Sequence, residues 1–496
     1  MHLDTLRSFL SWTLIALFLV TTAAVLFFTF GYRFNFERGI FIYTGSVTIK
    51  SNPRAVQILL DGVTVPNGNL NIINQSIHVA GIQPGEHFLR VEADGFIPWE
   101  KKITVESGIS TEFWNIILPR KEYKQSVLSS DAYAKAFVSP SEGSVFLTGE
   151  KDGKSFIKTV DKTSHESALI FESERYTFPI DTSENIEISW SDKRHILVPA
   201  LSKDTPTILI INTLTQEVTD LMEIAPIPAP SFARFHPTDE GAFFVLSDSS
   251  NLFLIRPEEE DAEKRATLLA SGISAYDLSP KYLYTLEKES GIVYRSAFGN
   301  EDEFSQDPVT LPLPAIQDAK SPLLTVYDEK RIAVYDPSGE GVLYNDSGER
   351  NPDIVSLGSN IEGVQFSNDG KKLLFFSDTD AKVLLTRDWE VQPARKTGDI
   401  IQVARFSSPL SSAQWTEDYE HIIFGIDKEV KIAELDSRDR RQIETLFALP
   451  DSRKLIQVLP SFEDNKIYLL TKDINNTAYL SSFLFPEEVS LFGGGG

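Results

Sequence analysis

The chain of 496 residues contains no cysteine, only two methionines and only seven histidines. Without cysteine it cannot form disulfide bonds or carry a lipid on a cysteine. The histidines stand at positions 2, 78, 87, 165, 195, 236 and 421, and none lies within four residues of another. This spacing excludes a zinc-binding helix with two neighbouring histidines.

Sequence motifs of catalysis are also missing. There is no Gly-x-Ser-x-Gly elbow and no calcium loop of the D-x-[DN]-x-[DN]-G type. The stretch GEKDGKS at 149–155 has three residues between its glycines, where a phosphate loop needs four, and we expect a hairpin turn at Asp152 and Gly153 instead. The sequence therefore predicts no enzyme, no cofactor, and no catalytic, cofactor-binding or metal-binding residue.

The charge is unevenly divided along the chain. The formal net charge is −24, yet residues 1–120 hold nine basic and nine acidic side chains, so the whole excess lies beyond Arg120. This change in composition predicts a domain boundary near Pro119. An acidic C-terminal part without a basic stripe is repelled by phosphates, which excludes nucleic acid as its partner.

One long apolar run lies near the N-terminus. Residues 9–30 carry no charge, and a helix of 22 residues reaches about 33 Å, enough to cross a hydrocarbon core of about 30 Å. The run is longer than that of a cleavable signal peptide, the main alternative, and no small-x-small site follows it. We therefore predict a cytoplasmic N-terminus at 1–8, a transmembrane signal anchor at 9–31 in contact with the lipid bilayer, and a single-pass cell-membrane protein whose large C-terminal part is extracytoplasmic. Trp12 would lie at the entry of the span.

Residues 45–119 show the period-two alternation of short strands. Val56, Ile58 and Leu60 alternate before the turn pair Asp61–Gly62, and the stretch 81–96 (GIQPGEHFLRVEADGF) alternates between two further glycine turns. About 75 residues suffice for a small two-sheet β-sandwich. In such a sandwich Trp99 is expected to seal the core, with a carbohydrate or protein contact as the alternative, and the role of Trp114 is open.

From residue 121 to 488 one pattern recurs eight times, at intervals of 40 to 53 residues: an apolar strand, a polar turn and a second apolar strand. Its anchor residues are Phe137, Trp190, Phe235, Leu278, Val326, Phe366, Trp415 and Leu459. Strand repeats of this length are typical of a β-propeller with one repeat per blade. We expect about eight blades, with seven as the alternative, and we expect the aromatic anchors to pack between blades.

Two resemblances follow from these motifs. The stretch 84–108 (PGEHFLRVEADGFIPWEKKITVESG) resembles the PEGA domain, a small β-sandwich of bacterial and archaeal surface proteins, and VQFSNDGKKLLFFSD at 364–378 resembles TolB-type and WD40-like propeller blades. The WD dipeptide is absent, so the likeness to TolB-type blades is the closer one. The PEGA resemblance implies a place in the cell envelope and binding to other envelope components, and it supplies no catalytic residues.

Ring closure and side-chain convergence are the remaining expectations. The last blade lacks an outer strand, and residues 123–128 are predicted to supply it, while 489–496 are predicted to form a flexible tail. His195, His236 and His421 lie near repeated strand starts, where a propeller channel could gather them, but a structural role is the expectation for each. Asp369 and Asp418 are turn acids without a calcium loop.

The function predicted from all this is a non-catalytic, membrane-anchored extracytoplasmic binding or scaffold protein of the cell envelope, in which the propeller presents a protein-interaction surface. An envelope protein or a cell-wall polysaccharide is the expected partner. Two alternatives stay open: a hydrolase acting on an envelope glycan or peptide, with its site in the propeller channel, and a cell-wall carbohydrate-binding module.

Overall fold

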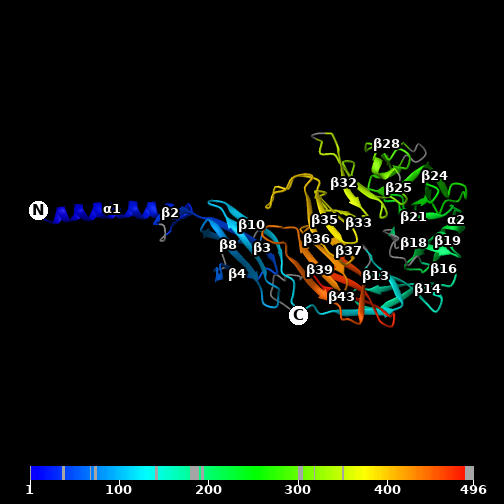
Figure 1. Cartoon of the computed structure of the whole chain (residues 1–496), viewed down its shortest axis with the longest axis horizontal. Coiled ribbons are helices and arrows are strands. Elements are labelled where there is room, and N and C mark those ends of the chain that lie inside the picture. The colour runs from blue at the N-terminus through cyan, green and yellow to red at the C-terminus, as the bar shows by residue number, and fades with distance from the viewer. Residues whose placement is uncertain are drawn as a thin grey trace.

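The computed structural model describes residues 2–35, 39–66, 69–71, 75–139, 143–178, 189–190, 195–299, 305–317, 319–348 and 351–485. Within them the chain forms three parts that follow one another from the N-terminus: a long helix, a small β-sandwich and a β-propeller (Figure 1). The all-β fold class behind an apolar helix is confirmed. The predicted tail at 489–496 lies outside the described residues.

The N-terminal part is the helix α1 (His2–Thr29), followed by a hairpin of β1 (Tyr32–Asn35) and β2 (Ile40–Tyr43). From Arg7 to Thr29 the helix is long and apolar enough to cross a membrane, and this stretch is not buried against the rest of the protein. Most of its surface is therefore free to contact an apolar environment, apart from the C-terminal turn that the hairpin touches.

The sandwich consists of two four-stranded sheets with the orders β10-β3-β7-β6 and β5-β4-β8-β9. Its strands are β3 (Gly45–Asn52), β4 (Gln57–Leu60), β5 (Val63–Thr64), β6 (Asn69–Asn71), β7 (Ser76–Ile82), β8 (Gly85–Glu92), β9 (Trp99–Val105) and β10 (Ser110–Ile117). The alternating residues of both sheets meet in one core, which includes Ile58 and Trp99. The predicted sandwich and the sealing role of Trp99 are thus confirmed.

The described residues of the C-terminal part form eight β-sheets, so the propeller has eight blades rather than seven. Seven of the blades follow in chain order, each a run of consecutive antiparallel strands, and the eighth is completed by β11. Two short helices, α2 (Leu221–Ile224) and η2 (Pro314–Ile316), lie in connections after blades 2 and 4.

The strands are β12 (Tyr133–Val138), β13 (Ser144–Lys151), β14 (Lys154–Asp161) and β15 (Ser167–Ser173) in blade 1; β16 (Tyr176–Thr177), β17 (Ser189–Trp190), β18 (His195–Ser202), β19 (Thr205–Asn212) and β20 (Val218–Asp220) in blade 2; β21 (Pro230–Phe235), β22 (Phe243–Ser247), β23 (Asn251–Ile255) and β24 (Ala266–Ser271) in blade 3; and β25 (Ile273–Leu278), β26 (Tyr282–Glu287), β27 (Val293–Ala297) and β28 (Asp307–Pro308) in blade 4. They continue with β29 (Leu323–Asp328), β30 (Arg331–Tyr335), β31 (Glu340–Asn345) and β32 (Asp353–Ser359) in blade 5; β33 (Gly363–Phe366), β34 (Lys372–Phe376), β35 (Asp380–Leu385) and β36 (Ile400–Arg405) in blade 6; β37 (Leu410–Trp415), β38 (His421–Ile426), β39 (Glu429–Glu434) and β40 (Ile443–Ala448) in blade 7; and β41 (Arg453–Ser461), β42 (Lys466–Asp473), β43 (Ala478–Leu484) and β11 (Ser126–Asp131) in blade 8.

The repeat anchors pack between neighbouring blades, as expected. Trp415 is buried in the cluster that joins blades 6 and 7, while Phe137, Phe235 and Phe366 are partly buried against such clusters. The side chain of Trp190 lies outside the described residues. The second strand of a blade is often buried on both faces, as in β38, where all six residues are buried. This burial explains why these strands read as continuous apolar runs.

Gly370, in the turn of the most regular repeat, shows why this turn needs a glycine. Gly370 in the turn between β33 and β34 has φ 64°, and a Cβ atom there would lie only 2.4 Å from the ring of Tyr327 in the neighbouring blade. Both the positive φ and the lack of space require glycine.

The ring closes by the predicted route, but the closing strand begins later in the chain than predicted. The outer strand of blade 8 is β11, which pairs antiparallel with β43, so it begins three residues later than the predicted 123–128. Tyr123 does not pair as a strand, because its ring packs 5.0 Å from that of Phe483 and its hydroxyl accepts a hydrogen bond from the backbone N–H of Arg120. The innermost strands of blades 8 and 1 are joined as well, since the backbone N–H of Ala136 donates to Gln457.

The propeller has two ends, and we name each end by its position relative to the sandwich. In blades 1 and 3–7 the connections from the first to the second strand and from the third to the fourth lie at one end. The corresponding connections are that from β19 to β20 in blade 2, where β16 and β17 both pair with β18, and that from β41 to β42 in blade 8. The sandwich contacts connections of this kind in blades 6 and 7, so we call this end the near face. The opposite end, with the connections from the second to the third strand, is the far face.

Closure generates the first prediction. Replacing Ser126–Asp131 by a glycine-serine hexapeptide in the full chain should lower the Tm by several degrees, because β43 loses its partner and becomes an unpaired edge. Differential scanning calorimetry measures this. The control is the same replacement at residues 258–263, in the connection between β23 and β24, and equal Tm values for the two variants would contradict closure by β11.

Candidate functional site

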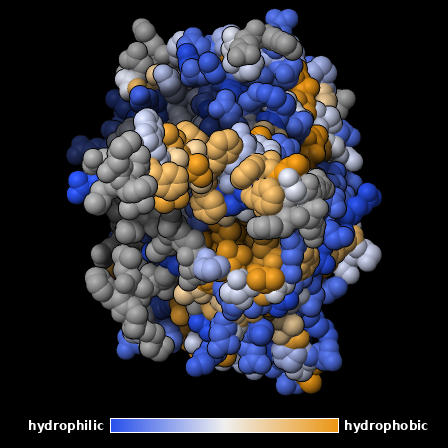
Figure 2. Space-filling view, turned by 90° about the vertical axis from the view of Figure 1, so that its left-hand side faces the viewer, coloured by the Kyte–Doolittle hydropathy of each residue, from blue (hydrophilic) through white to orange (hydrophobic). Residues whose placement is uncertain are grey.

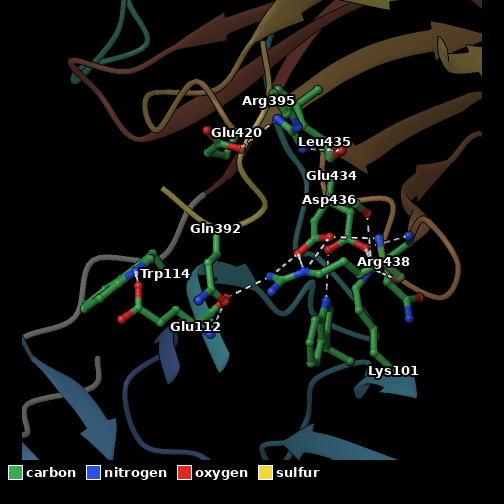
Figure 3. A network of polar contacts seen from close by, with 12 residues as sticks. Lys101, Glu112, Trp114, Gln392, Arg395, Glu420, Glu434, Leu435, Asp436 and Arg438 are labelled. Carbon is green, nitrogen blue, oxygen red and sulfur yellow. Dashed lines mark hydrogen bonds and ion pairs between the residues drawn. The ribbon is translucent and has the colours of Figure 1, made fainter. Parts of the chain in front are cut away.

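The junction between the sandwich and the near face of the propeller gathers buried charges from distant parts of the sequence. It is formed by β9 and β10 of the sandwich and by propeller connections of blades 6 and 7 (Figure 3). We call this set of contacts the junction.

Lys101 is the centre of the junction. It is fully buried, and its Nζ lies 2.6 Å from Oε1 of Glu434 in β39. The same ammonium group donates to the backbone oxygens of Asp436, Arg438 and Arg440 at 3.1, 2.9 and 2.7 Å. A buried ammonium group is tolerated only when an opposite charge lies nearby and its N–H groups have hydrogen-bond acceptors. Here the propeller supplies both the opposite charge and the acceptors.

The carboxylate of Glu434 is held by partners from both parts of the protein. Its Oε2 accepts a hydrogen bond from Nε1 of Trp99 at 3.0 Å, and its Oε1 accepts one from the backbone N–H of Gln442 at 2.9 Å. The Trp99 ring also packs edge-on against Phe113, 5.0 Å away. Trp99 therefore seals the sandwich core with its ring and binds the propeller with its nitrogen.

Two propeller side chains cover β10, the edge strand of its sheet. Gln392 accepts from the backbone N–H of Glu112 and donates to the oxygen of Ser110, both at 3.0 Å. Arg438 is held by Asp436 at 2.5 Å, lies 3.9 Å from the centre of the Phe113 ring, and donates to the backbone oxygen of Glu112. Backbone N–H and C=O groups of this edge strand thus bind the propeller. They are therefore not available to pair with a strand of another molecule.

The buried His421 and the partly buried Asp418 form an ion pair beside the junction. Nδ1 of His421 lies 2.8 Å from Oδ2 of Asp418, in the turn between β37 and β38. Burial by itself would raise the pKa of Asp418, but the charge and hydrogen bonds of His421, Thr416 and the backbone lower it to about 2. Burial by itself would likewise lower the pKa of His421, but Asp418, with Glu434 and Glu420 farther away, raises it above its usual value.

The other histidines that the sequence singled out have separate surroundings. His195 contacts Asn212 within blade 2, at 3.1 Å. His236 accepts hydrogen bonds from the backbone of Thr238 and Asp239 in a turn of blade 3. Across the described ranges no group of three or more His, Asp or Glu side chains is placed to hold a metal ion.

The acidic turn residues and the incomplete phosphate loop have local structural roles. Asp369 accepts a hydrogen bond from Ser367 at 2.7 Å and another from the backbone of Lys371, as Asp418 does with Thr416 in the next blade. Asp152 and Gly153 have φ values of 53° and 75° in the hairpin between β13 and β14. This is the predicted hairpin turn, whose two positive φ values suit a two-residue connection.

A groove of about 340 Å³ lies next to the junction, between the ends of β3 and β10 and the near face of blades 7 and 8. Its lining combines aromatic and polar side chains, among them Lys50, Asn52, Trp114, Thr416, Phe462 and Lys466. Trp114 is half-buried, and its Nε1 donates to Glu112 at 2.8 Å, which fixes the indole plane.

The sequence patterns do not predict the junction, although they contain one signal of it. Trp99, Ile103 and Val105 alternate as buried positions of β9, and Lys101 stands in phase with them. A lysine at a core-facing position requires a buried acceptor, which is the clue to a second domain.

The junction generates a stability prediction. Lys101→Met should lower the free energy of unfolding by about 3–5 kcal/mol, because it leaves the Glu434 carboxylate buried without its cation. Lys101→Met combined with Glu434→Gln should recover a large part of this loss, since it removes both charges. Urea unfolding measures both changes.

The control for this prediction is Lys428→Met. Lys428 pairs with Asp451 at 2.9 Å, but both side chains are exposed, so the loss should stay within about 0.5 kcal/mol. A Lys101→Met protein as stable as the control would contradict the account of the junction.

The His421–Asp418 pair generates a pH prediction. The raised pKa of His421 contributes stability that is complete below the unfolded-state value of about 6.5 and is lost as the pH rises through the higher folded-state value. The Tm difference between the wild type and His421→Gln should therefore be largest near pH 6 and should shrink towards pH 9. The exposed His165, changed to Asn because its φ is 61°, is the control, and a difference independent of pH would refute the ion pair.

Comparison with known proteins agrees with this architecture. Residues 44–117 match the family model of the PEGA domain, which covers the sandwich and does not extend into the propeller. No curated protein matches the chain by sequence.

Solved structures similar to the chain include β-propellers. They include the C-terminal WD40 domain of Sif2 (10% identity, TM-score 0.47, covering 73% of this chain and 98% of that one), the Dos1 propeller (12%, 0.47, 73% and 94%) and BamB from Moraxella catarrhalis (11%, 0.44, 73% and 100%). At these identities the likeness concerns the fold alone, and the blade count comes from the sheets described above. The chain thus joins an apolar N-terminal helix, a PEGA domain and an eight-bladed β-propeller.

Proposed function

We propose that the protein is a membrane-anchored, extracytoplasmic scaffold of the cell envelope, and that the far face of its propeller binds another envelope protein. The observation that supports this most is the position of the junction. The PEGA domain contacts the near face in blades 6 and 7 through the fixed contacts of Lys101 and Gln392. The far face is therefore turned away from the domain that leads to α1.

The distribution of charge agrees with this arrangement. The excess of negative charge lies beyond Arg120, in the linker and the propeller. Anionic lipid headgroups repel such a surface, which favours a propeller held away from the bilayer by the PEGA domain. The same repulsion disfavours nucleic acid.

The groove beside the junction favours a second candidate, binding of a cell-wall carbohydrate. A fixed indole at Trp114, with Phe462, Asn52 and Lys50 in the same lining, combines a flat apolar surface with hydrogen-bonding groups. Sugar rings present the same combination of apolar faces and hydroxyl edges. This function predicts binding of wall glycan fragments that Trp114→Ala abolishes, whereas the far-face scaffold predicts no such loss.

The hydrolase alternative gains no support from the groove. Among its described lining residues the acids are Glu417 and Asp418, and Asp418 is held ionised by His421, with a pKa of about 2. A general acid requires a carboxyl group whose pKa is raised rather than lowered.

The absence of cysteine allows a sharp test of the scaffold function. Ile474, 81% exposed in the turn between β42 and β43, lies on the far face, whereas Leu214, 64% exposed in the turn between β19 and β20, lies on the near face. We would introduce Ile474→Cys or Leu214→Cys and treat intact cells with a membrane-impermeant, cysteine-reactive photo-crosslinker. Both cysteines should react, and only the one at position 474 should give a cross-linked partner after illumination.

Two outcomes of this test would contradict the proposal. Reaction that appears only after the membrane is permeabilised would place the propeller in the cytoplasm. Equal cross-linking from both positions would remove the preference for the far face.

A further inference from the structure

The segment between α1 and the PEGA domain is short and carries an aromatic surface of its own. The helix ends at Thr29, β1 begins at Tyr32, β2 ends at Tyr43, and the sandwich begins at Gly45. Figure 1 shows β2 beside the end of α1, before the sandwich. The described residues therefore leave no spacer between the apolar helix and the hairpin of β1 and β2.

One face of this hairpin is entirely aromatic. In the antiparallel register Tyr32 stands opposite Tyr43 and Phe34 opposite Phe41, so the four rings share a face. The rings of each pair lie 5.1 and 5.2 Å apart, and Phe27 of α1 packs against Tyr32 and Phe41 at 5.2 and 5.7 Å. The aromatic face is thus continuous with the apolar surface of the helix.

Three of the four rings are exposed, and Tyr32 is partly buried. The exposed fractions are 43% for Phe34, 60% for Phe41 and 43% for Tyr43. Figure 2 views the molecule from the side of α1 and shows hydrophobic residues gathered in the middle of this face, with hydrophilic residues around them. An exposed aromatic cluster of this kind requires an apolar or interfacial partner.

The length of the helix fixes where the hairpin lies relative to a bilayer. The span from Arg7 to Thr29 has 23 residues and measures about 34 Å, against a hydrocarbon core of about 30 Å. With Arg7 at one boundary, only about 4 Å of helix extends past the other, so the hairpin begins in the headgroup layer. Tyrosine, whose ring is apolar and whose hydroxyl is polar, is enriched at this depth.

Arg33 marks the same boundary. Its guanidinium lies 3.4 Å from the centre of the Phe28 ring and donates to the backbone oxygen of Phe28 at 2.8 Å. It therefore places a positive charge at the C-terminal turn of α1, where the helix dipole favours a cation. A cation at this height faces the lipid phosphates, which an arginine binds well.

From these observations we propose that the hairpin of β1 and β2 is a lipid-binding element that inserts its aromatic face into the headgroup layer and fixes the PEGA domain on the membrane surface. The proposal rests on the membrane anchor of the proposed function. Contacts to the sandwich support the second half of it. Thr44 donates to the oxygen of Gly31 at 2.6 Å, Ser107 donates to that of Tyr43 at 2.6 Å, and Gly108 lies against the Tyr43 ring.

A depth measurement tests this on the full chain, which needs no removal of native cysteines. Nitroxide labels are placed singly by Leu19→Cys, Phe41→Cys and Ile474→Cys in protein reconstituted into phosphatidylcholine vesicles with 20% phosphatidylglycerol. Electron paramagnetic resonance then compares collisions with oxygen, which concentrates in the bilayer, and with a water-soluble nickel chelate. We expect position 19 to report the hydrocarbon core, position 474 to report water, and position 41 to report the headgroup layer.

A matched label at Ile40→Cys separates the two faces of the hairpin. Ile40 is 53% exposed but stands on the opposite face from Phe41, so it should lie shallower. Water-like accessibility at position 41 with a buried position 19 would overturn the hairpin proposal and leave the anchor intact. Water-like accessibility at both would overturn the anchor as well. Strong spin–spin broadening at position 41 alone would assign the face to a second copy of the chain and would also overturn the proposal.

Discussion

The buried ammonium of Lys101 is the constraint on which the arrangement of the domains depends. It lies in the sandwich, yet its four acceptors, the Glu434 carboxylate and three backbone oxygens, belong to the propeller. If the domains separated, the charge on each side would lose its match or would have to be hydrated again. The contacts of Gln392 and Arg438 on β10 add directional hydrogen bonds, so the junction favours one relative orientation.

In the proposed function, this constraint couples the orientation of the propeller to that of α1. The contacts of Thr44 and Ser107 join the hairpin to the sandwich, and the junction joins the sandwich to the propeller. In the proposed function, an orientation that α1 and the hairpin take at the membrane is therefore passed on to the blades. The PEGA-domain contacts described above are with the near face, which leaves the far-face turns for the partner that the proposed scaffold function requires.

Much of this architecture was predictable from local sequence patterns. The eight anchors, from Phe137 to Leu459, reflect burial that each blade requires separately, so the repeat is visible without any long-range information. The apolar helix and the alternation around Ile58 are equally local. The predicted start of β11 lies three residues too early, because nothing in the sequence shows that Tyr123 packs on Phe483 instead of pairing with a strand.

The junction was not predictable in the same way. Lys101 and Glu434 are more than 300 positions apart, and nothing in either segment names the other as its partner. Phase alone marks Lys101 as unusual, since it alternates with core residues of β9. The roles of His421 and Asp418 likewise depend on the turn that brings them to 2.8 Å.

A distance distribution across the junction tests the central claim most directly. Nitroxides at Val63→Cys in β5 and Leu214→Cys in the propeller, both at exposed positions, report the orientation of the two domains in double electron–electron resonance. A fixed junction predicts one narrow distribution in the wild-type background and a broader one with Lys101→Met. A broad distribution already in the wild-type background would show that the PEGA domain and the propeller move independently, and would contradict the account.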